Sequence, residues 1–196
     1  TVIAGGICLV AEVNPKAITV RHSQGWVDEV YTELDKLVQR LEEARKEKEA
    51  VSLAYQGNIV VLLEYLLENK IEVELGSDQT SLHNPYAGGY YPVGVEFEEA
   101  NRLMAGEPER FRELVHASLR RHVDAINGLA EAGMYFWDYG NAFLLESGRA
   151  GADIFKEDGN YKYQSYVQAI MGPLFFDYGF GPFRWVCTSA DPADLA

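Results

Sequence analysis

Polar side chains able to bind a ligand gather in residues 76–83, which read Gly-Ser-Asp-Gln-Thr-Ser-Leu-His. The segment offers a carboxylate, an amide, hydroxyl groups and an imidazole, and it follows residues 71–75, which we expect to form a strand. Open parallel sheets bind ligands outside the carboxyl ends of their strands, so this is a suitable place for a binding loop. A polar loop in which Asp78 caps the next turn explains the same residues equally well.

Two further segments place aromatic and amide groups where a ligand could bind. Residues 88–91 read Gly-Gly-Tyr-Tyr, and aromatic rings behind a flexible double glycine can lie against a flat ligand. The same tyrosines could instead anchor the loop to the core. Residues 137–141 lie at the end of another expected strand, where the hydroxyl of Tyr139 and the amide of Asn141 either face one crevice or simply complete a turn.

An acidic residue, Glu12, ends the apolar run of residues 7–11. In dinucleotide-binding folds, an acid at the end of the second strand accepts hydrogen bonds from the adenosine ribose hydroxyls. When this feature stands alone, a solvent-exposed glutamate at a strand end is the commoner explanation. The glycine-rich turn that would hold the phosphates is expected about 20 residues upstream, which is outside this sequence.

Several classes of chemistry find no support in the sequence. His116 and His122 are six residues apart on one expected helix, whereas a helical pair of metal ligands needs a spacing of four, so we expect no metal site. Neither a Gly-x-Ser-x-Gly motif, a phosphate-loop lysine motif nor a Cys-x-x-Cys pair is present. The formal net charge of −13 disfavours nucleic acid and anionic membrane surfaces as partners. No run of about 18 apolar residues could span a bilayer.

The elements that would position these groups alternate between strands and helices. Residues 1–6 indicate the last turn of a helix closed by Gly5-Gly6. Apolar runs predict strands at residues 7–11, 51–55, 71–75, 134–137 and 183–187. The spacing of apolar residues predicts helices at residues 15–20, 25–49, 60–67, 96–104, 108–132, 142–149 and 166–176. The alternation predicts an α/β fold with a parallel sheet flanked by helices and long functional loops at the strand carboxyl ends.

Taken together, five segments resemble the urocanase family. They are residues 4–13 (AGGICLVAEV), 76–83 (GSDQTSLH), 83–92 (HNPYAGGYYP), 136–141 (FWDYGN) and 179–189 (GFGPFRWVCTS). The likeness covers essentially the whole chain in order and is closer to the animal-like branch. The resemblance implies a Rossmann-like domain that binds NAD. It also implies hydration of urocanate to imidazolonepropionate in histidine breakdown, with NAD⁺ acting as an electrophile and no net loss of hydride.

The resemblance assigns roles to residues at matching positions. Glu12 is expected to hold the adenosine ribose. The other expected NAD contacts are Asn58, Ile59, Gln79, Thr80, Ser81, Leu82, His83, Tyr90, Tyr91 and Tyr139. An arginine contact of many members falls near Lys16-Ala17, where this chain has no arginine. The catalytic cysteine of the family lies downstream in a different motif, so no catalytic residue is expected here and Cys187 is interpreted as structural.

We therefore expect residues 1–196 to form a single Rossmann-like NAD-binding domain, an excerpt of a longer enzyme, since the chain starts abruptly without Met. The parent enzyme is expected to be a cytoplasmic homodimer with reduced cysteines, and the isolated chain to be inactive. Two alternatives remain open. A NAD-dependent dehydrogenase domain would need a proton-relay pair such as Tyr-x-x-x-Lys, which is absent. A non-catalytic ligand-binding module could use the acidic helix at residues 26–49 as a partner surface.

Overall fold

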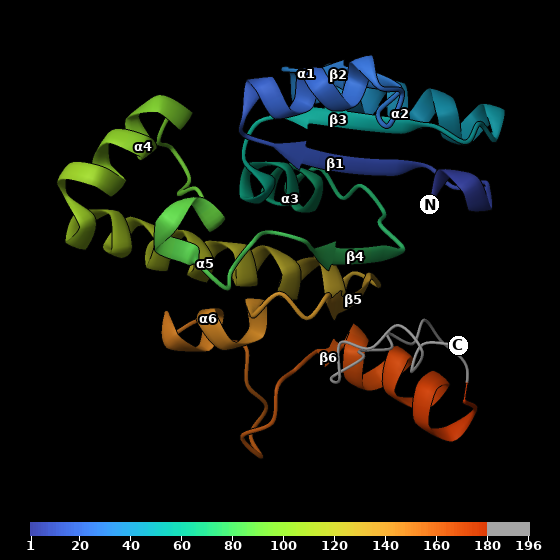
Figure 1. Cartoon of the computed structure of the whole chain (residues 1–196). Helices are drawn as coiled ribbons and strands as arrows, with labels where there is room; N and C mark the ends of the chain where they lie inside the picture. The colour runs from blue at the N-terminus through green and yellow to red at the C-terminus, as the bar shows by residue number, and fades with distance from the viewer. Residues whose placement is uncertain (180–196) are drawn as a thin grey trace, which may run out of the picture.

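Parallel strands alternate with helices along the chain, whose residues 1–179 are described by a computed structural model (Figure 1). The strands are β1 (Cys8–Glu12), β2 (Glu29–Tyr31), β3 (Ser52–Gln56), β4 (Leu75–Asp78), β5 (Tyr135–Asp138) and β6 (Gln164–Ser165). The helices are α1 (Pro15–Ser23), α2 (Leu34–Glu47), α3 (Ile59–Glu68), α4 (Phe97–Gly106), α5 (Pro108–Glu131) and α6 (Phe143–Arg149). All strand pairs are parallel, in the orders β1-β3-β2 and β4-β5-β6. The expected α/β fold with parallel pairing is confirmed, as two three-stranded sheets.

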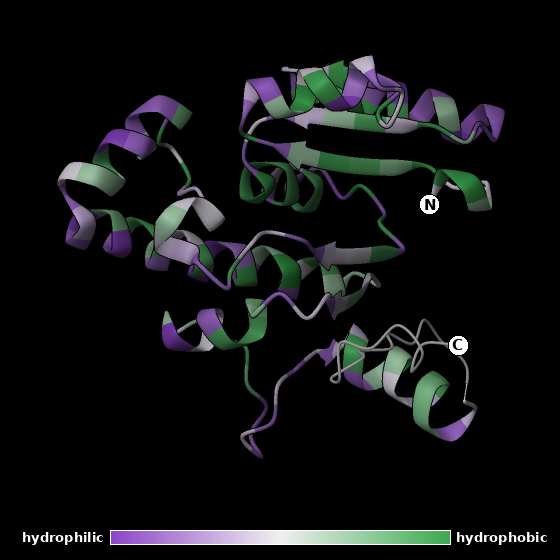
Figure 2. Cartoon of the chain, in the orientation of Figure 1, coloured by the Kyte–Doolittle hydropathy of each residue, from purple (hydrophilic) through white to green (hydrophobic). Residues whose placement is uncertain are grey.

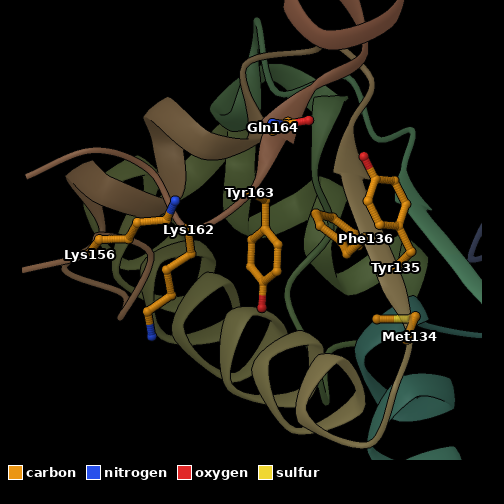
Figure 3. A pocket seen from close by; sticks show the side chains of 7 residues that line it. All are labelled: Met134, Tyr135, Phe136, Lys156, Lys162, Tyr163 and Gln164. Atoms are coloured by element: carbon orange, nitrogen blue, oxygen red, sulfur yellow. The ribbon is translucent and has the colours of Figure 1, made fainter.

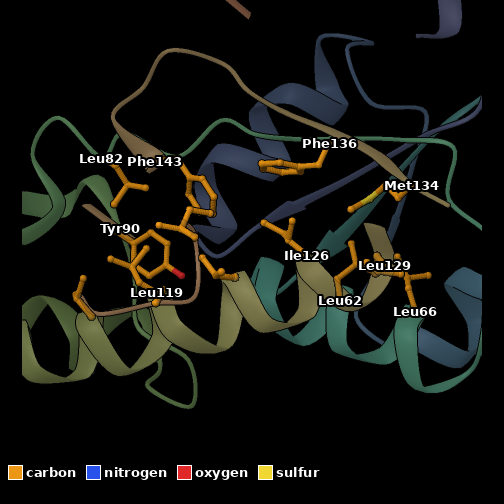
Figure 4. Packing of buried hydrophobic residues seen from close by; sticks show 14 of the residues in the cluster. Leu62, Leu66, Leu82, Tyr90, Leu119, Ile126, Leu129, Met134, Phe136 and Phe143 are labelled. Carbon is orange, nitrogen blue, oxygen red and sulfur yellow. The ribbon is translucent and has the colours of Figure 1, made fainter. Parts of the chain in front are cut away.

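One apolar core joins the two sheets. Helices α3 and α5 pack against each other, and they also contact β1 and β5 respectively. Figure 4 shows Leu62 and Leu66 of α3 beside Ile126 and Leu129 of α5, with Phe136 of β5 above them. In Figure 2, α3 and much of β1 are hydrophobic, whereas α4 carries hydrophilic residues. Burial of each such aliphatic side chain stabilises a fold by about 1.5–3 kcal/mol, so this shared layer holds the two sheets together.

Two asparagine caps start helices at the carboxyl ends of neighbouring strands. Asn14 follows β1, and its Oδ1 accepts hydrogen bonds from the N–H groups of Lys16 and Ala17 at the start of α1. Asn58 follows β3, and its Oδ1 accepts a hydrogen bond from the Val60 N–H at 3.0 Å. These caps satisfy backbone donors that no helical carbonyl reaches. They bring the positive ends of α1 and α3 to the same edge of the first sheet.

The helix expected at residues 25–49 begins later than predicted. Residues Glu29–Tyr31 form β2 instead, and α2 starts only at Leu34. Asp28, just before β2, is bonded to the first residue of β3. Its carboxylate accepts hydrogen bonds from the backbone N–H of Ser52 at 2.8 Å and from the Ser52 hydroxyl at 2.7 Å. The prediction was wrong here because Val30 and Tyr31 also fit helical spacing, while pairing with β3 decides the structure.

The third strand begins later than expected and occupies part of the anticipated loop. The sequence predicted residues 71–75, whereas β4 covers Leu75–Asp78 and pairs with β5 from Leu75↔Tyr135 to Asp78↔Asp138. Glycine, serine and aspartate have little intrinsic preference for strands, so the pairing partner decides this position. The short strand β6 was also not anticipated.

The remaining expected elements agree with the structure where it can be described. The strands predicted at 7–11, 51–55 and 134–137 correspond to β1, β3 and β5, each shifted by one residue. The helix predicted at 166–176 consists of two π-helical turns, Val167–Met171 and Pro173–Asp177. The strand predicted at 183–187, including Cys187, lies outside the described residues. None of the helices in residues 1–179 combines the length and the hydropathy that a membrane span requires.

The strands β1 and β4 are the facing edges of the two sheets. In Figure 1, β4 lies below β1 and both arrows point the same way. Hydrogen bonds to β3 use Cys8 and Glu12, so the backbone groups of Leu9 and Ala11 turn to the free edge. The Tyr135 N–H donates to the Glu74 carbonyl, so Leu75 and Ser77 turn to the free edge of β4. No hydrogen bond joins β1 to β4 within the described part of the chain.

Candidate cofactor site

Glu12, at the carboxyl end of β1, has a partly exposed carboxylate. Its Oε1 accepts a hydrogen bond from the Asn14 N–H at 2.9 Å, and its Oε2 lies 3.3 Å from Nη1 of Arg21. The side chain is 28% exposed, so it keeps capacity to accept further hydrogen bonds. The carboxylate is therefore oriented by α1 and the turn before it, and it remains accessible to hydroxyl groups of a ligand.

Arg21, on the outer part of α1, forms an ion pair with Glu12. Arg21 lies four residues after Ala17, near which the resemblance led us to expect an arginine contact, and residues four apart share one face of a helix. A hollow along this face is lined by Asn14, Lys16, Ala17, Val20, Arg21 and Gln24. The four-residue offset is the sequence signal that could have identified this arginine.

The loop after β4 turns its side chains alternately outward and inward. Gln79, Ser81 and His83 are exposed, Thr80 is half-buried, and Leu82 is completely buried. This loop is tied to the segment after it, because the Ser81 N–H donates a hydrogen bond to the Gly89 carbonyl at 2.9 Å. Three polar side chains of the expected binding loop therefore face outward at the carboxyl end of β4.

Tyr90 lies in the core and has no outward-facing ring. It is 2% exposed, and its hydroxyl lies 3.2 Å from Nδ1 of His122. Burial raises the pKa of Tyr90 well above its ordinary value and lowers the pKa of His122, so both groups are neutral near pH 7. Figure 4 shows Tyr90 with Leu82 and Phe143 around it. Tyr90 and Leu82 support the loop from beneath, so contacts with a ligand would come from their backbone atoms.

Tyr91 and Asn58 connect the end of β3 to the tyrosine segment. Nδ2 of Asn58 donates a hydrogen bond to the Tyr91 carbonyl at 2.9 Å, and Ile59 beside it is half-buried. The hydroxyl of Tyr91 donates to Oδ1 of Asn101 at 2.9 Å. Burial raises the pKa of Tyr91, and the negative charge of Glu12 adds to this shift. The structure therefore brings Glu12, Asn58 and Tyr91 into one neighbourhood.

Tyr139 and Asp138 end β5 and have opposite exposure. Tyr139 is 52% exposed, and its ring stacks on Tyr166 with 5.9 Å between centroids. Asp138 is buried beside Asp78 in the strand register, and its Oδ2 accepts a hydrogen bond from the Gly140 N–H at 3.1 Å. Its Oδ1 is buried without a hydrogen-bond partner among the described residues. Burial raises the pKa of Asp138, a residue that the sequence did not single out.

A second hollow lies away from these strand ends. About 310 Å³ in volume, it is lined by Met134, Tyr135, Phe136, Lys156, Lys162, Tyr163 and Gln164. Figure 3 shows the aromatic rings on one side and the two lysines on the other. Lys162 is paired with Asp153 at 2.6 Å. The residues at the start of β5 place this hollow at the opposite end of the strand from Tyr139. Across residues 1–179, no three His, Cys, Asp or Glu side chains gather as metal ligands.

Gly89 is required where the loop and the tyrosine segment meet, because an added Cβ would overlap the Ser81 carbonyl oxygen and lie 2.5 Å from that of Asn84. We expect Gly89→Ala to lower the free energy of unfolding by about 1–3 kcal/mol, since backbone must move to admit the methyl group. Gly106→Ala is the matched control, because nothing lies within 4 Å of its added Cβ. Urea denaturation of both variants tests this, and equal stabilities would contradict the close approach.

The parallel strands, capped helices and polar loops at the strand carboxyl ends define a Rossmann-like α/β domain. The family model described as the urocanase Rossmann-like domain matches residues 1–170, and that of the urocanase C-terminal domain matches residues 173–196. The chain belongs to the urocanase family, which confirms the resemblance. The single domain expected over residues 1–196 stays a prediction.

Curated relatives are similar over nearly the whole chain. The chain is 60% identical to a probable urocanate hydratase of Dictyostelium discoideum, over 98% of its own length and 29% of that protein. It is 57% identical to the urocanate hydratase of Homo sapiens, over 100% of its length and 30% of that protein. The urocanate hydratase of Mus musculus is 56% identical over 99% of the chain and 30% of the mouse protein. The chain thus spans less than a third of each of these relatives.

Proposed function

We propose that this chain is the NAD-binding core of a longer urocanate hydratase. The observation that carries the proposal is the match to the urocanase Rossmann-like domain, with Glu12 and the 79–83 loop at strand carboxyl ends. The longer protein would add water to urocanate and release imidazolonepropionate. Bound NAD⁺ would supply an electrophilic nicotinamide ring for this reaction. Family membership favours this function over a dehydrogenase domain or a non-catalytic binding module.

The described residues fit a dinucleotide at the strand carboxyl ends. The accessible carboxylate of Glu12 suits the two hydroxyl groups of a ribose, which need acceptors. The outward side chains of Gln79, Ser81 and His83 offer donors and acceptors for amide and phosphate groups. The exposed ring of Tyr139 offers a flat face. We propose that Asn58, Ile59, Thr80 and Tyr91 line this surface, and that Leu82 and Tyr90 contribute through backbone atoms.

The strand order supports a ligand between the two sheets. From β1 the chain passes through α1 to the outer strand β2 and returns through α2 to β3, which lies between β1 and β2. It then crosses through α3 to β4 in the other sheet. In doubly wound folds, such a reversal of strand order marks the crevice where dinucleotides bind. We propose that a strand of the longer protein lies between the free edges of β1 and β4. Its carboxyl end would deliver the phosphate-binding turn between Glu12 and Gln79.

Replacing Glu12 by alanine in the longer protein should weaken NAD⁺ binding roughly ten- to hundredfold, because a charge-assisted hydrogen bond is lost. Turnover at saturating NAD⁺ should change little, since a ribose contact stabilises ground and transition states alike. Isothermal titration and saturation kinetics measure the two effects. Arg21→Gln is the control, because it removes the ion pair and keeps the carboxylate. If the alanine variant binds NAD⁺ as tightly as the parent, Glu12 is only a strand-end carboxylate.

The pathway, compartment, oligomeric state and substrate of the longer protein are also proposals. We propose that it acts in histidine breakdown in the cytoplasm, as a homodimer with urocanate as its small-molecule substrate. Within residues 1–179, Cys8 forms no disulfide. The family relatives, named for urocanate hydration, support the substrate.

A further inference from the structure

Two loops of the candidate site are joined through one buried pair of side chains. Asp78 is the last residue of β4 and directly precedes the 79–83 loop. Asn141 closes the turn after β5 that carries Tyr139. Nδ2 of Asn141 donates a hydrogen bond to Oδ2 of Asp78 at 2.7 Å. The two residues are 3% and 7% exposed, so the bond lies out of contact with bulk water.

The Asp78 carboxylate collects donors from both loops at one oxygen atom. Besides the Asn141 amide, Oδ2 of Asp78 accepts hydrogen bonds from the Thr80 hydroxyl at 2.7 Å and the Thr80 N–H at 3.2 Å. A buried carboxylate is costly unless donors surround it, and the loss of one partner leaves an uncompensated polar group. The carboxylate of Asp78 therefore favours one arrangement of the two loops, in which the donors of Thr80 and of Asn141 both remain hydrogen-bonded to it.

Asn141 also bonds to backbone atoms on both sides of the pair. Its amide nitrogen also lies 2.6 Å from the Thr80 carbonyl oxygen and 3.2 Å from that of Asp78. Its Oδ1 accepts a hydrogen bond from the Phe143 N–H at 3.3 Å, at the start of α6. One amide group thus bonds to the backbone of the 79–83 loop and to the first turn of the following helix.

We propose that Asp78 and Asn141 are positioning residues that hold the 79–83 loop and the Tyr139 turn in the arrangement that receives the cofactor. The outward residues lie next to the pair in sequence, because Gln79 follows Asp78 and Tyr139 lies two residues before Asn141. A change in the buried bond is therefore transmitted directly to both exposed segments. This inference rests on the proposed cofactor site, and both side chains are buried beneath the two segments that would face the cofactor.

Asn141→Asp in the longer protein tests the proposal, because it places a second carboxylate against Asp78 without a change in size. We expect amide hydrogen exchange in residues 79–83 to accelerate roughly tenfold or more, and the Kd for NAD⁺ to rise by a similar factor. If Asn141→Asp fails to fold, Asp78→Asn alone keeps the shape and should still accelerate exchange of the loop.

Asp28→Asn is the matched control, since Asp28 also bonds to backbone and hydroxyl donors but connects β2 to β3. It should leave exchange in residues 79–83 and the Kd unchanged, whatever it does to the melting temperature. Unchanged exchange of the loop in Asn141→Asp, or in Asp78→Asn where the first variant does not fold, would overturn the proposal. If the parent protein itself binds no NAD⁺, the proposed function fails, and loop exchange still decides whether the pair holds the two segments.

Discussion

Backbone amides on the facing edges of the two sheets are expected to exchange rapidly in the 196-residue chain and slowly in the longer protein. The groups of Leu9 and Ala11 face the free edge of β1, and those of Leu75 and Ser77 face the free edge of β4. Unpaired strand edges attract another strand, because each missing hydrogen bond leaves a polar group unsatisfied. A strand inserted between them would slow exchange roughly a hundredfold or more, since local opening would then require breaking the sheet.

Val10 provides an internal control on the same strand. Val10 lies between Leu9 and Ala11 in the sequence, and its backbone groups face β3. Its amide should therefore be protected to a similar degree in both proteins. Mass spectrometry with fragmentation to single residues can measure all of these amides. If Leu9 and Ala11 remain as unprotected in the longer protein as in this chain, no strand occupies the space between β1 and β4.

Elements with strong local signals could be predicted from the sequence. The apolar run of β1, the asparagine cap and proline that begin α1, and the long apolar stripe of α5 each determine their structure locally. The strands β2 and β6 could not be found this way, because three and two residues carry too little periodicity. Pairing across the sheet decides them, as it also decides that Gly76, Ser77 and Asp78 belong to β4.

The candidate site could be predicted in part. Residues Gln79, Ser81 and His83 face outward at a strand end, as a binding loop requires. The sequence could not show that Tyr90 is buried against His122, because the two residues are 32 positions apart. It also could not show that Asp78 bonds to Asn141 across 63 positions. These are long-range contacts, and a single sequence carries no local signal for them.

The assay that tests the central claim most directly follows urocanate and NADH together in the longer protein. Hydration of urocanate removes its conjugated absorbance, and NAD⁺ that acts as an electrophile returns unchanged after each turnover. We expect urocanate absorbance to disappear over many turnovers with no accumulation of NADH. The 196-residue chain should show no turnover and bind NAD⁺ weakly. Among its described residues the facing edges of β1 and β4 are unpaired, and its net charge of −13 repels the diphosphate. Stoichiometric formation of NADH from a hydroxy substrate, with urocanate left unconverted, would contradict the account.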